Sequence, residues 1–369
     1  SKIKKLFNGL INAMRYVMTG LLAGILLAFI PVFDTHTGFV LQPLWHGALH
    51  KIQTIEPSST KIDKLSFAIT TDSGYYHLDA NGALKRFIAG GDNFIKPTID
   101  GNFYISYKKV GNDITMYNAT NEIFWKIASA EYPYSAPDGS IIVLLTADGS
   151  SARIADFNGN IYANTQLNGQ FCTAVAFSPQ GGFAGIGFID GRFYIVNNRG
   201  QSIYAGQSPQ GTIVKGIAID STGQFAIVHC GDSSKDLLLC INIARQKTWL
   251  HELSTSHHVK TALAVNSSGH ALFLDMHSLL AVDIKDKDVT EYPVVKKRYG
   301  QSQINNTDDI FTITYPAATG GSVWYIWDWN KGKLYSREFF EEPFLYSIIS
   351  NNLILLQGQE MLACFAYQQ

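Results

Sequence analysis

The chain has 369 residues, of which 46% are hydrophobic and 12% aromatic, a composition typical of a folded protein rather than a disordered one. Its 29 Lys and Arg residues balance 30 Asp and Glu residues, and this near-zero net charge argues against binding to nucleic acid. The four cysteines are scattered without a CxxC pair, which excludes a dense disulfide framework and argues against a zinc site. Cys230 and Cys240 flank one predicted hairpin turn and could pair in an oxidising compartment, but buried free thiols are the plainer expectation.

The first predicted element is a membrane-spanning helix. Residues 17–33 read VMTGLLAGILLAFIPVF without a charge; Arg15 and three lysines precede them, and the next basic residue is Lys51. At about 1.5 Å per residue, this run and its flanks cross most of a hydrocarbon core roughly 30 Å thick. The basic flank predicts a single-pass protein of the inner membrane, with its N-terminus in the cytoplasm and the rest of the chain in the periplasm.

This segment is expected to be a retained anchor rather than a removed signal peptide, because no small-x-small cleavage site occurs in residues 31–37 (PVFDTHT). Within it, Gly20, Gly24 and Ala28 recur every four residues and share one helix face. Such a stripe lets a second transmembrane helix pack closely; the alternative is that glycine and alanine are simply common in membrane helices. We assign residues 1–35 to the cytoplasmic N-terminus and anchor, and residues 36–49 to a linker.

From residue 50 to residue 369 the chain alternates short strand-like runs with Gly, Asn and Asp, without helical periodicity, and this pattern predicts an all-β domain. The turn glycines Gly139, Gly181 and Gly223 lie 42 residues apart, and Gly269 follows after 46. A period of about 40 residues with four strands per unit is typical of a β-propeller, in which each unit forms one blade.

The number of blades follows from the candidate innermost strands. These begin near His50, Ile95, Tyr134, Thr173, Val214, Lys260, Ile310 and Phe344, which predicts eight blades. Seven is the alternative, because the last unit has only three strands before the sequence stops at Gln369. We predict that residues 38–44 (GFVLQPL), within the linker, supply the missing outer strand and close the ring.

The turn MYNATNEIFWKI, which contains Asn118, Asn121 and Trp125, resembles the repeat of quinoprotein-like propellers, in which Asp-x-x-x-Gly precedes an aromatic residue. LDANGALKRF and VNNRGQSIYA are weaker copies, and AFSPQGG (residues 176–182) is similar to an inner turn of WD40 propellers. This resemblance covers about residues 50–369 and implies a fold rather than an activity. Proteins of this shape include the propeller lipoprotein of the outer-membrane barrel assembly machinery, but this chain has no lipoprotein cysteine after its apolar run.

The resemblance also bears on cofactors, because propeller dehydrogenases that bind pyrroloquinoline quinone carry a docking tryptophan in most blades. Here Trp324, Trp327 and Trp329 crowd into one predicted strand, so we expect the docking tryptophans to be missing and no cofactor to be bound. Trp327 and Trp329 share one face of that strand. We expect this face either to pack in the core or to form an aromatic patch for a partner protein.

Two polar segments are further candidates. The neighbours His257 and His258 lie in a predicted inter-blade connection, where we expect them to be solvated and not to bind metal. The cluster of Lys296, Lys297 and Arg298 opens the longest polar connection. It is expected to be a solvated loop or, alternatively, a contact for an acidic partner or a lipid surface.

Together these features predict a non-catalytic, membrane-anchored propeller that serves as an assembly or interaction subunit of a larger membrane complex. Its partners would be the lipid bilayer and other transmembrane or periplasmic proteins. The alternative is a periplasmic enzyme or small-ligand sensor with a site in the central cavity. Such a site gathers one residue from each blade and leaves no local motif.

Overall fold

The structure is a computed structural model that describes residues 40–48, 66–258, 260–294, 302–318, 321–339, 344–350, 353–358 and 361–368. Residues Pro43–Ala366 form one compact unit. Its described residues form strands, with one 3₁₀ turn, η2 (Pro209–Gly211). None of the helical segments among them is long and apolar enough to cross a membrane, and the expected anchor at residues 17–33 lies outside the described residues.

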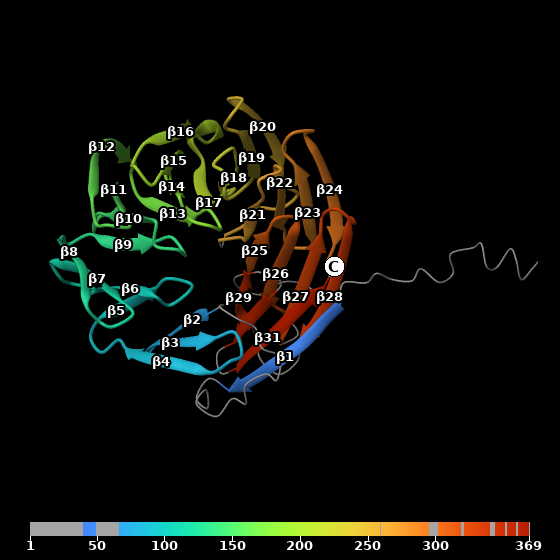
Figure 1. The fold of residues 1–369 in the computed structure, drawn as a ribbon. Coiled ribbons are helices and arrows are strands. Elements are labelled where there is room, and N and C mark those ends of the chain that lie inside the picture. Colours follow the sequence, from blue (N-terminus) through green and yellow to red (C-terminus); the bar gives the residue numbers. More distant parts are fainter. Residues whose placement is uncertain are drawn as a thin grey trace, which may run out of the picture. The chain divides into compact units, whose positions relative to one another are not determined.

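Eight antiparallel sheets are arranged around a common centre (Figure 1). Blade 1 contains β2 (Ser66–Thr71), β3 (Gly74–Asp79) and β4 (Leu84–Ala89); blade 2 contains β5 (Phe94–Pro97), β6 (Phe103–Tyr107), β7 (Asp113–Asn118) and β8 (Ile123–Ala128). Blade 3 contains β9 (Tyr132–Ser135), β10 (Ile141–Leu145), β11 (Ser151–Asp156) and β12 (Ile161–Asn168); blade 4 contains β13 (Cys172–Phe177), β14 (Phe183–Phe188), β15 (Arg192–Asn197) and β16 (Ser202–Gln207).

The remaining blades follow the same order from the centre outward. Blade 5 contains β17 (Ile213–Ile219), β18 (Phe225–Gly231), β19 (Asp236–Asn242) and β20 (Lys247–Glu252); blade 6 contains β21 (Leu263–Val265), β22 (His270–Leu274), β23 (Ser278–Asp283) and β24 (Asp288–Pro293). Blade 7 contains β25 (Gln303–Thr307), β26 (Ile310–Pro316), β27 (Ser322–Asp328) and β28 (Lys333–Phe339); blade 8 contains β29 (Phe344–Ser350), β30 (Leu353–Gly358), β31 (Met361–Gln368) and β1 (Val40–Ala48).

The prediction of an all-β, eight-bladed propeller is confirmed, and the seven-bladed alternative is wrong. The turn glycines explain the regular repeat: Gly139, Gly181 and Gly223 have φ values of 75°, 75° and 68°, a region that glycine enters without strain. Blade 8 combines both ends of the chain, because β1 pairs with β31 as its fourth strand. The linker, in which the outer strand was predicted, therefore contributes that strand.

Most of the predicted innermost strands begin within three residues of the observed ones, but Ile310 does not. Ile310 begins β26, the second strand of blade 7, and the innermost strand is β25. The sequence of β25, QINNT, is too polar to show the alternation by which strands are recognised. The first predicted innermost strand, near His50, lies outside the described residues.

Apolar clusters fill the junctions between neighbouring blades. One of them joins blades 5 and 6, where Ile227 and Phe273 are fully buried, and another joins blades 3 and 4 through Ile154 and Ile186. Burying such a side chain contributes about 1.5–3 kcal/mol, so the stacking of blades is the main source of stability.

Three tryptophans on outermost strands reinforce this stacking. The indole N–H of Trp125 donates to the carbonyl of Phe157 in the next blade at 2.8 Å, and that of Trp249 donates to Ile284 at 3.1 Å. Trp45 of β1 joins blade 8 to blade 1 in the same way. The expectation that docking tryptophans are missing is therefore wrong. It failed because it required them in most blades, whereas here they lie on blades 2, 5 and 8.

In blade 1 an arginine takes the place of the tryptophan. Arg86 follows Asp79 by seven residues, as Trp125 follows Asn118. Its guanidinium donates to the carbonyl of Ala119 in blade 2, to the carbonyl of Gly101 and, at 2.7 Å, to the hydroxyl of Tyr75. A planar cation that donates several hydrogen bonds thus joins blades 1 and 2 where an indole joins other pairs.

Candidate functional site

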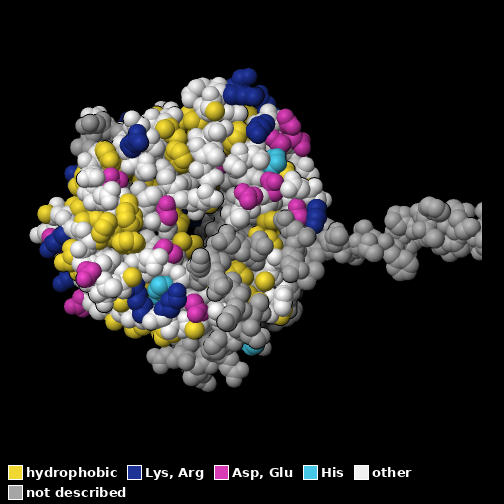
Figure 2. All heavy atoms as spheres, in the orientation of Figure 1, with side chains coloured by type: hydrophobic (Ala, Val, Ile, Leu, Met, Phe, Trp, Pro, Cys, Tyr) yellow, Lys and Arg dark blue, Asp and Glu magenta, His cyan; other side chains and the backbone are white. Residues whose placement is uncertain are grey.

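The innermost strands surround a central cavity of about 1720 Å³, and Figure 2 shows the hollow at the middle of one face. Its described walls are mainly small or apolar side chains such as Ala136, Ala218 and Ala264. The charged residues on these described walls are Asp72 and Lys260. In the part of the chain that the structure describes, no group of three or more His, Cys, Asp or Glu residues is arranged to hold a metal ion.

Exposed hydrophobic side chains are distributed unevenly around the ring. Blade 1 has Phe87 and blade 5 has Leu250, whereas blades 2 to 4 and the turns leading into them have Phe94, Ile99, Val110, Ile123, Phe124, Tyr134, Phe171 and Ile189. On the face shown in Figure 2, hydrophobic side chains gather on the side where β5 to β9 lie in Figure 1. Blades 2 to 4 and their turns therefore hold most of the exposed large hydrophobic side chains among the described residues.

Four aromatic residues form what we call the aromatic rim: Phe94, Tyr107, Tyr134 and Phe171. Phe94 begins β5, Tyr107 ends β6 and Phe171 precedes β13, so these three lie at the edge where innermost strands begin, and Tyr134 lies within β9. Phe94, Tyr134 and Phe171 are 50%, 37% and 54% exposed. Because the four residues come from three neighbouring blades, no local motif in the sequence indicates the rim.

Lys96 connects the first part of the rim. Its ammonium lies 5.4 Å from the ring centre of Tyr107 and 4.4 Å from that of Tyr134, and it donates to the carbonyl of Pro133 at 2.8 Å. Burial lowers the pKa of Lys96 to about 8. The rings of Phe94 and Tyr107 are 5.5 Å apart. These cation–π and ring contacts hold the rings in fixed positions.

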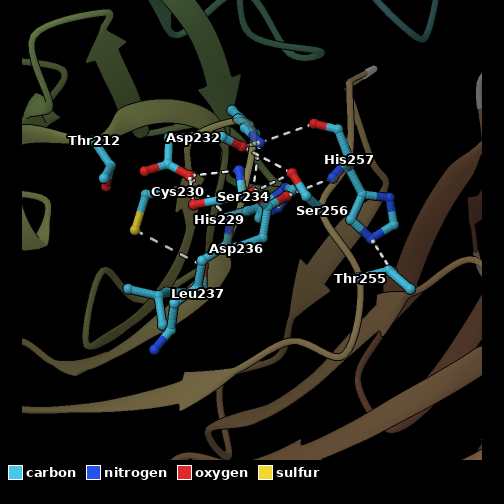
Figure 3. A network of polar contacts seen from close by, with 12 residues as sticks. Thr212, His229, Cys230, Asp232, Ser234, Asp236, Leu237, Thr255, Ser256 and His257 are labelled. Carbon is cyan, nitrogen blue, oxygen red and sulfur yellow. Dashed lines mark hydrogen bonds and ion pairs between the residues drawn. The ribbon is translucent and has the colours of Figure 1, made fainter.

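A second candidate site is a buried polar cluster between blades 5 and 6, shown in Figure 3, which we call the polar clamp. At its centre Asp236 binds His229 Nε2 at 2.8 Å and Lys215 Nζ at 2.5 Å. The backbone N–H of His257 donates to the same carboxylate at 2.9 Å, and Lys215 also donates to the carbonyl of His257 at 2.8 Å. The clamp therefore fixes the connection that leads from blade 5 into blade 6.

The protonation states in the clamp follow from its geometry. His229 Nδ1 lies 2.7 Å from the hydroxyl of Thr261, so a neutral imidazole with its proton on Nε2 satisfies both partners. Burial lowers the pKa of His229, although Asp236 acts in the opposite direction. Burial would raise the pKa of Asp236, but hydrogen bonds from His229 and Lys215 outweigh it and hold that pKa at about 2. The clamp thus contains one ion pair and a neutral histidine.

The connectivity Thr261–His229–Asp236 is that of a catalytic triad, but these residues are only 2%, 0% and 0% exposed. Their burial suits a structural clamp. His257 extends the clamp, because its Nε2 lies 2.7 Å from Asp275 Oδ1. The expectation that His257 is solvated is wrong, since it is 2% exposed; His258 is exposed, as expected.

Of the two residues of the predicted aromatic patch, Trp327 and Trp329, only Trp329 is partly exposed. Trp327 is 2% exposed and packs 4.6 Å from the ring of Tyr292, so the core-packing alternative describes it and it is not available to a partner. Trp329 lies just beyond the end of β27 and is half-buried. Its indole stacks on the imidazole of His270 at 4.2 Å and so joins blade 7 to blade 6.

The other predicted contacts lie outside the described residues. They are Gly20, Gly24 and Ala28 of the expected anchor and Lys296, Lys297 and Arg298 of the polar connection. Cys230 and Cys240 are buried free thiols, and burial raises the pKa of Cys230 to about 11. They do not pair with each other.

Eight radial sheets, joined by apolar clusters and docking side chains, define an eight-bladed β-propeller. A family model described as beta-propeller protein matches residues 11–315, and the chain belongs to that family. A similar solved structure is the crystal structure of BamB from Moraxella catarrhalis, with a TM-score of 0.57 and 12% sequence identity over 89% of this chain and 98% of that chain. At this identity the likeness shows the fold alone. None of the curated proteins matches the chain.

Proposed function

We propose that this protein is a non-catalytic, membrane-anchored propeller that binds a partner protein through the aromatic rim, as an interaction subunit of a larger membrane complex. The supporting observation is the concentration of exposed large hydrophobic side chains on blades 2 to 4. Exposed apolar side chains that gather on one part of a surface mark interaction sites, and aromatic residues carry much of the binding energy in protein interfaces.

The geometry of the rim favours tight binding. Fully burying an exposed aromatic side chain contributes about 1.5–3 kcal/mol, and the half-exposed rings of the rim have about half of this to gain. Rings that are already fixed lose little conformational entropy on binding. Contacts to Lys96 fix Tyr107 and Tyr134. The backbone N–H of Ile189 donates to the carbonyl of Phe171 at 2.8 Å and fixes the turn that presents Phe171.

Membrane attachment is the second part of the proposal. The supporting observation is the uncharged run at residues 17–33, which is long enough to cross most of a hydrocarbon core. Residues 34–39 separate it from β1, a link that reaches about 20 Å when fully extended. We place the chain in the inner membrane with the propeller in the periplasm, because the basic residues precede the apolar run.

Blade 8 and the blades that carry the rim lie on different parts of the ring. β1 belongs to blade 8, and in an eight-bladed ring blade 4 is the opposite blade. Blades 2 to 4 are therefore separated from blade 8 by blade 1 on one side and by blades 5 to 7 on the other (Figure 1). A partner can reach blades 2 to 4 without displacing β1.

The test compares full-length protein and a Phe94→Ser/Phe171→Ser variant, each purified from its native membranes in mild detergent. Leu250→Ser is the matched control, because Leu250 is 49% exposed on the outer strand of blade 5. We expect a protein present in stoichiometric amount with the wild type and the control, and its loss from the rim variant. Equal recovery with all three proteins would contradict the proposal. A monomer that carries a bound small molecule would favour the enzyme or sensor alternative.

Topology has its own test. A reporter that is active only in the periplasm, fused after Gln369, should be active in the full-length chain. Its activity should be lost when residues 17–33 are deleted. A signal only from a cytoplasmic reporter at the same position would contradict the proposed orientation.

A further inference from the structure

The junction between blades 1 and 2 differs chemically from the apolar junctions described above. Tyr104 pairs with Tyr117, and Ser106 with Thr115, across β6 and β7, so these four side chains share one face of blade 2. The opposite face has Ile105, Ile114 and Met116, which join the apolar cluster with blade 3. Blade 2 thus presents hydroxyl groups toward blade 1.

The residue that joins the two blades reinforces this difference. Arg86 occupies the docking position of blade 1, and its guanidinium is turned toward the carbonyls of Ala119 and Gly101 and the hydroxyl of Tyr75. A narrow guanidinium fills less of the junction than an indole. A pocket of about 370 Å³ remains between the blades.

The described residues that line this pocket are all uncharged. One wall is the segment Phe87–Gly90, and the other residues are Asn93, Ile95, Tyr104, Ser106, Tyr117 and Asn121. The rings of Tyr104 and Tyr117 are stacked, with centres 5.0 Å apart and planes at 13°. The volume lies within the range of small-molecule sites, roughly 300–1,000 Å³.

The polar atoms of the pocket are partly engaged and partly available. Asn93 Nδ2 donates to Ser106 Oγ at 3.0 Å, and the hydroxyl of Tyr104 donates to Asn121 Oδ1 at 3.3 Å. These bonds orient both amides and leave Asn93 Oδ1, Asn121 Nδ2 and the Tyr117 hydroxyl to bind a ligand. Asn121 is also held by its left-handed backbone, with φ of 63°.

We propose that this pocket binds a neutral sugar unit. A sugar ring has an apolar face that packs on aromatic rings and a set of hydroxyls that pair with amides and hydroxyl groups. The uncharged lining provides no cation to pair with a phosphate or a carboxylate. The pocket shares no residue with the aromatic rim, and the proposal does not depend on the proposed function.

The test uses full-length protein in a detergent without a sugar headgroup. The probes are maltose, cellobiose and N,N′-diacetylchitobiose, with binding measured by saturation-transfer NMR and calorimetry. We expect at least one of them to bind. Tyr117→Phe and Asn121→Gly, which keeps the positive φ, should each weaken binding about 3- to 10-fold, the loss of one hydrogen bond.

Tyr204→Phe is the matched control, because Tyr204 stacks on Phe193 in blade 4 and lies far from the pocket in sequence. It should leave binding unchanged, and melting curves should show that all variants fold. Absence of binding to every probe would overturn the proposal. So would binding that both pocket variants leave intact, or a preference for glucuronate or a tripeptide over the neutral sugars.

Discussion

The indole N–H of Trp45 donates a 2.9 Å hydrogen bond to the carbonyl of Ala80, and this contact joins the first described strand of the chain to the first blade. Trp45 is 6% exposed and packs in a cluster with Leu78 and Leu362, from blades 1 and 8. The closure of the ring is therefore noncovalent. It has the same form as the joints that Trp125 and Trp249 make elsewhere in the propeller.

Removing the closing side chain should destabilise the propeller. Trp45→Ala deletes a buried indole and should lower the free energy of unfolding by about 3–5 kcal/mol. Trp45→Phe keeps most of the packing, loses the hydrogen bond and should cost about 1 kcal/mol. Urea unfolding measures both. Trp249→Phe is the control, because it removes the same kind of hydrogen bond between two blades inside the ring. If Trp249→Phe lowered the free energy of unfolding and neither Trp45 variant did, β1 would not close the ring.

The polar clamp should make the protein less stable in acid. The folded-state pKa of His229 is lowered, so the unfolded chain takes up a proton first, and stability should fall as the pH drops below about 6.5. The pKa of Asp236 is held at about 2, so its contribution is present above the unfolded value and is lost between about pH 4 and pH 2. The free energy of unfolding as a function of pH measures this.

The variant His229→Gln separates the loss of stability due to His229 from the loss due to Asp236. Glutamine can donate to Asp236 and accept from Thr261 but does not titrate, so the decline that begins near pH 6.5 should flatten while the more acidic step remains. A wild-type protein that gains stability between about pH 7 and pH 5 would show that the folded state does not hold His229 neutral.

Removing one partner of the ion pair in the clamp should lower the free energy of unfolding more than removing both partners. Lys215→Met leaves the fully buried carboxylate of Asp236 without its cation and should destabilise the fold by about 3–5 kcal/mol. Adding Asp236→Asn removes the buried charge and should recover part of this loss. Denaturant unfolding of the single and double variants gives the coupling between the two residues. Strictly additive costs would mean that the pair does not act as a unit.

Arg86 should not be replaceable by lysine. Its guanidinium satisfies the carbonyls of Ala119 and Gly101 and the hydroxyl of Tyr75 together, and an ammonium cannot reach all three with the same geometry. Arg86→Lys should lower the free energy of unfolding by about 1.5–3 kcal/mol, the value of a hydrogen bond to a charged group. Lys126→Arg, at an exposed ion pair with Asp113, is a control that should change stability little. Equal effects of the two changes would contradict the docking role of Arg86.

The sequence predicts the repeat well because the repeat is local. Turns such as those at Gly139 and Gly181 need positive φ, and their spacing gives the blade length and the number of blades. The docking role of Trp125 and Trp249 could also have been found, since each follows the turn asparagine of its blade by seven residues. The prediction missed this seven-residue spacing because it considered only whether most blades contain a tryptophan.

The sites are harder to predict because they join residues that are distant in the sequence. Phe94, Tyr134 and Phe171 of the aromatic rim lie about 40 residues apart, at the blade period, and each by itself reads as an ordinary strand residue. From the sequence, His257 is indistinguishable from an exposed loop histidine, because its partner Asp275 is 18 residues away in the chain. Only the stacking of blades brings these groups together.

Site-specific photo-crosslinking in living cells tests the proposed function most directly. A photoreactive phenylalanine analogue replaces Phe171, Phe94 or, as control, Leu250 in the full-length chain. The account predicts that positions 171 and 94 form a crosslink to the same membrane-associated protein and that position 250 does not. Crosslinks of equal yield at all three positions, or none at the two rim positions, would show that the aromatic rim is not the binding surface.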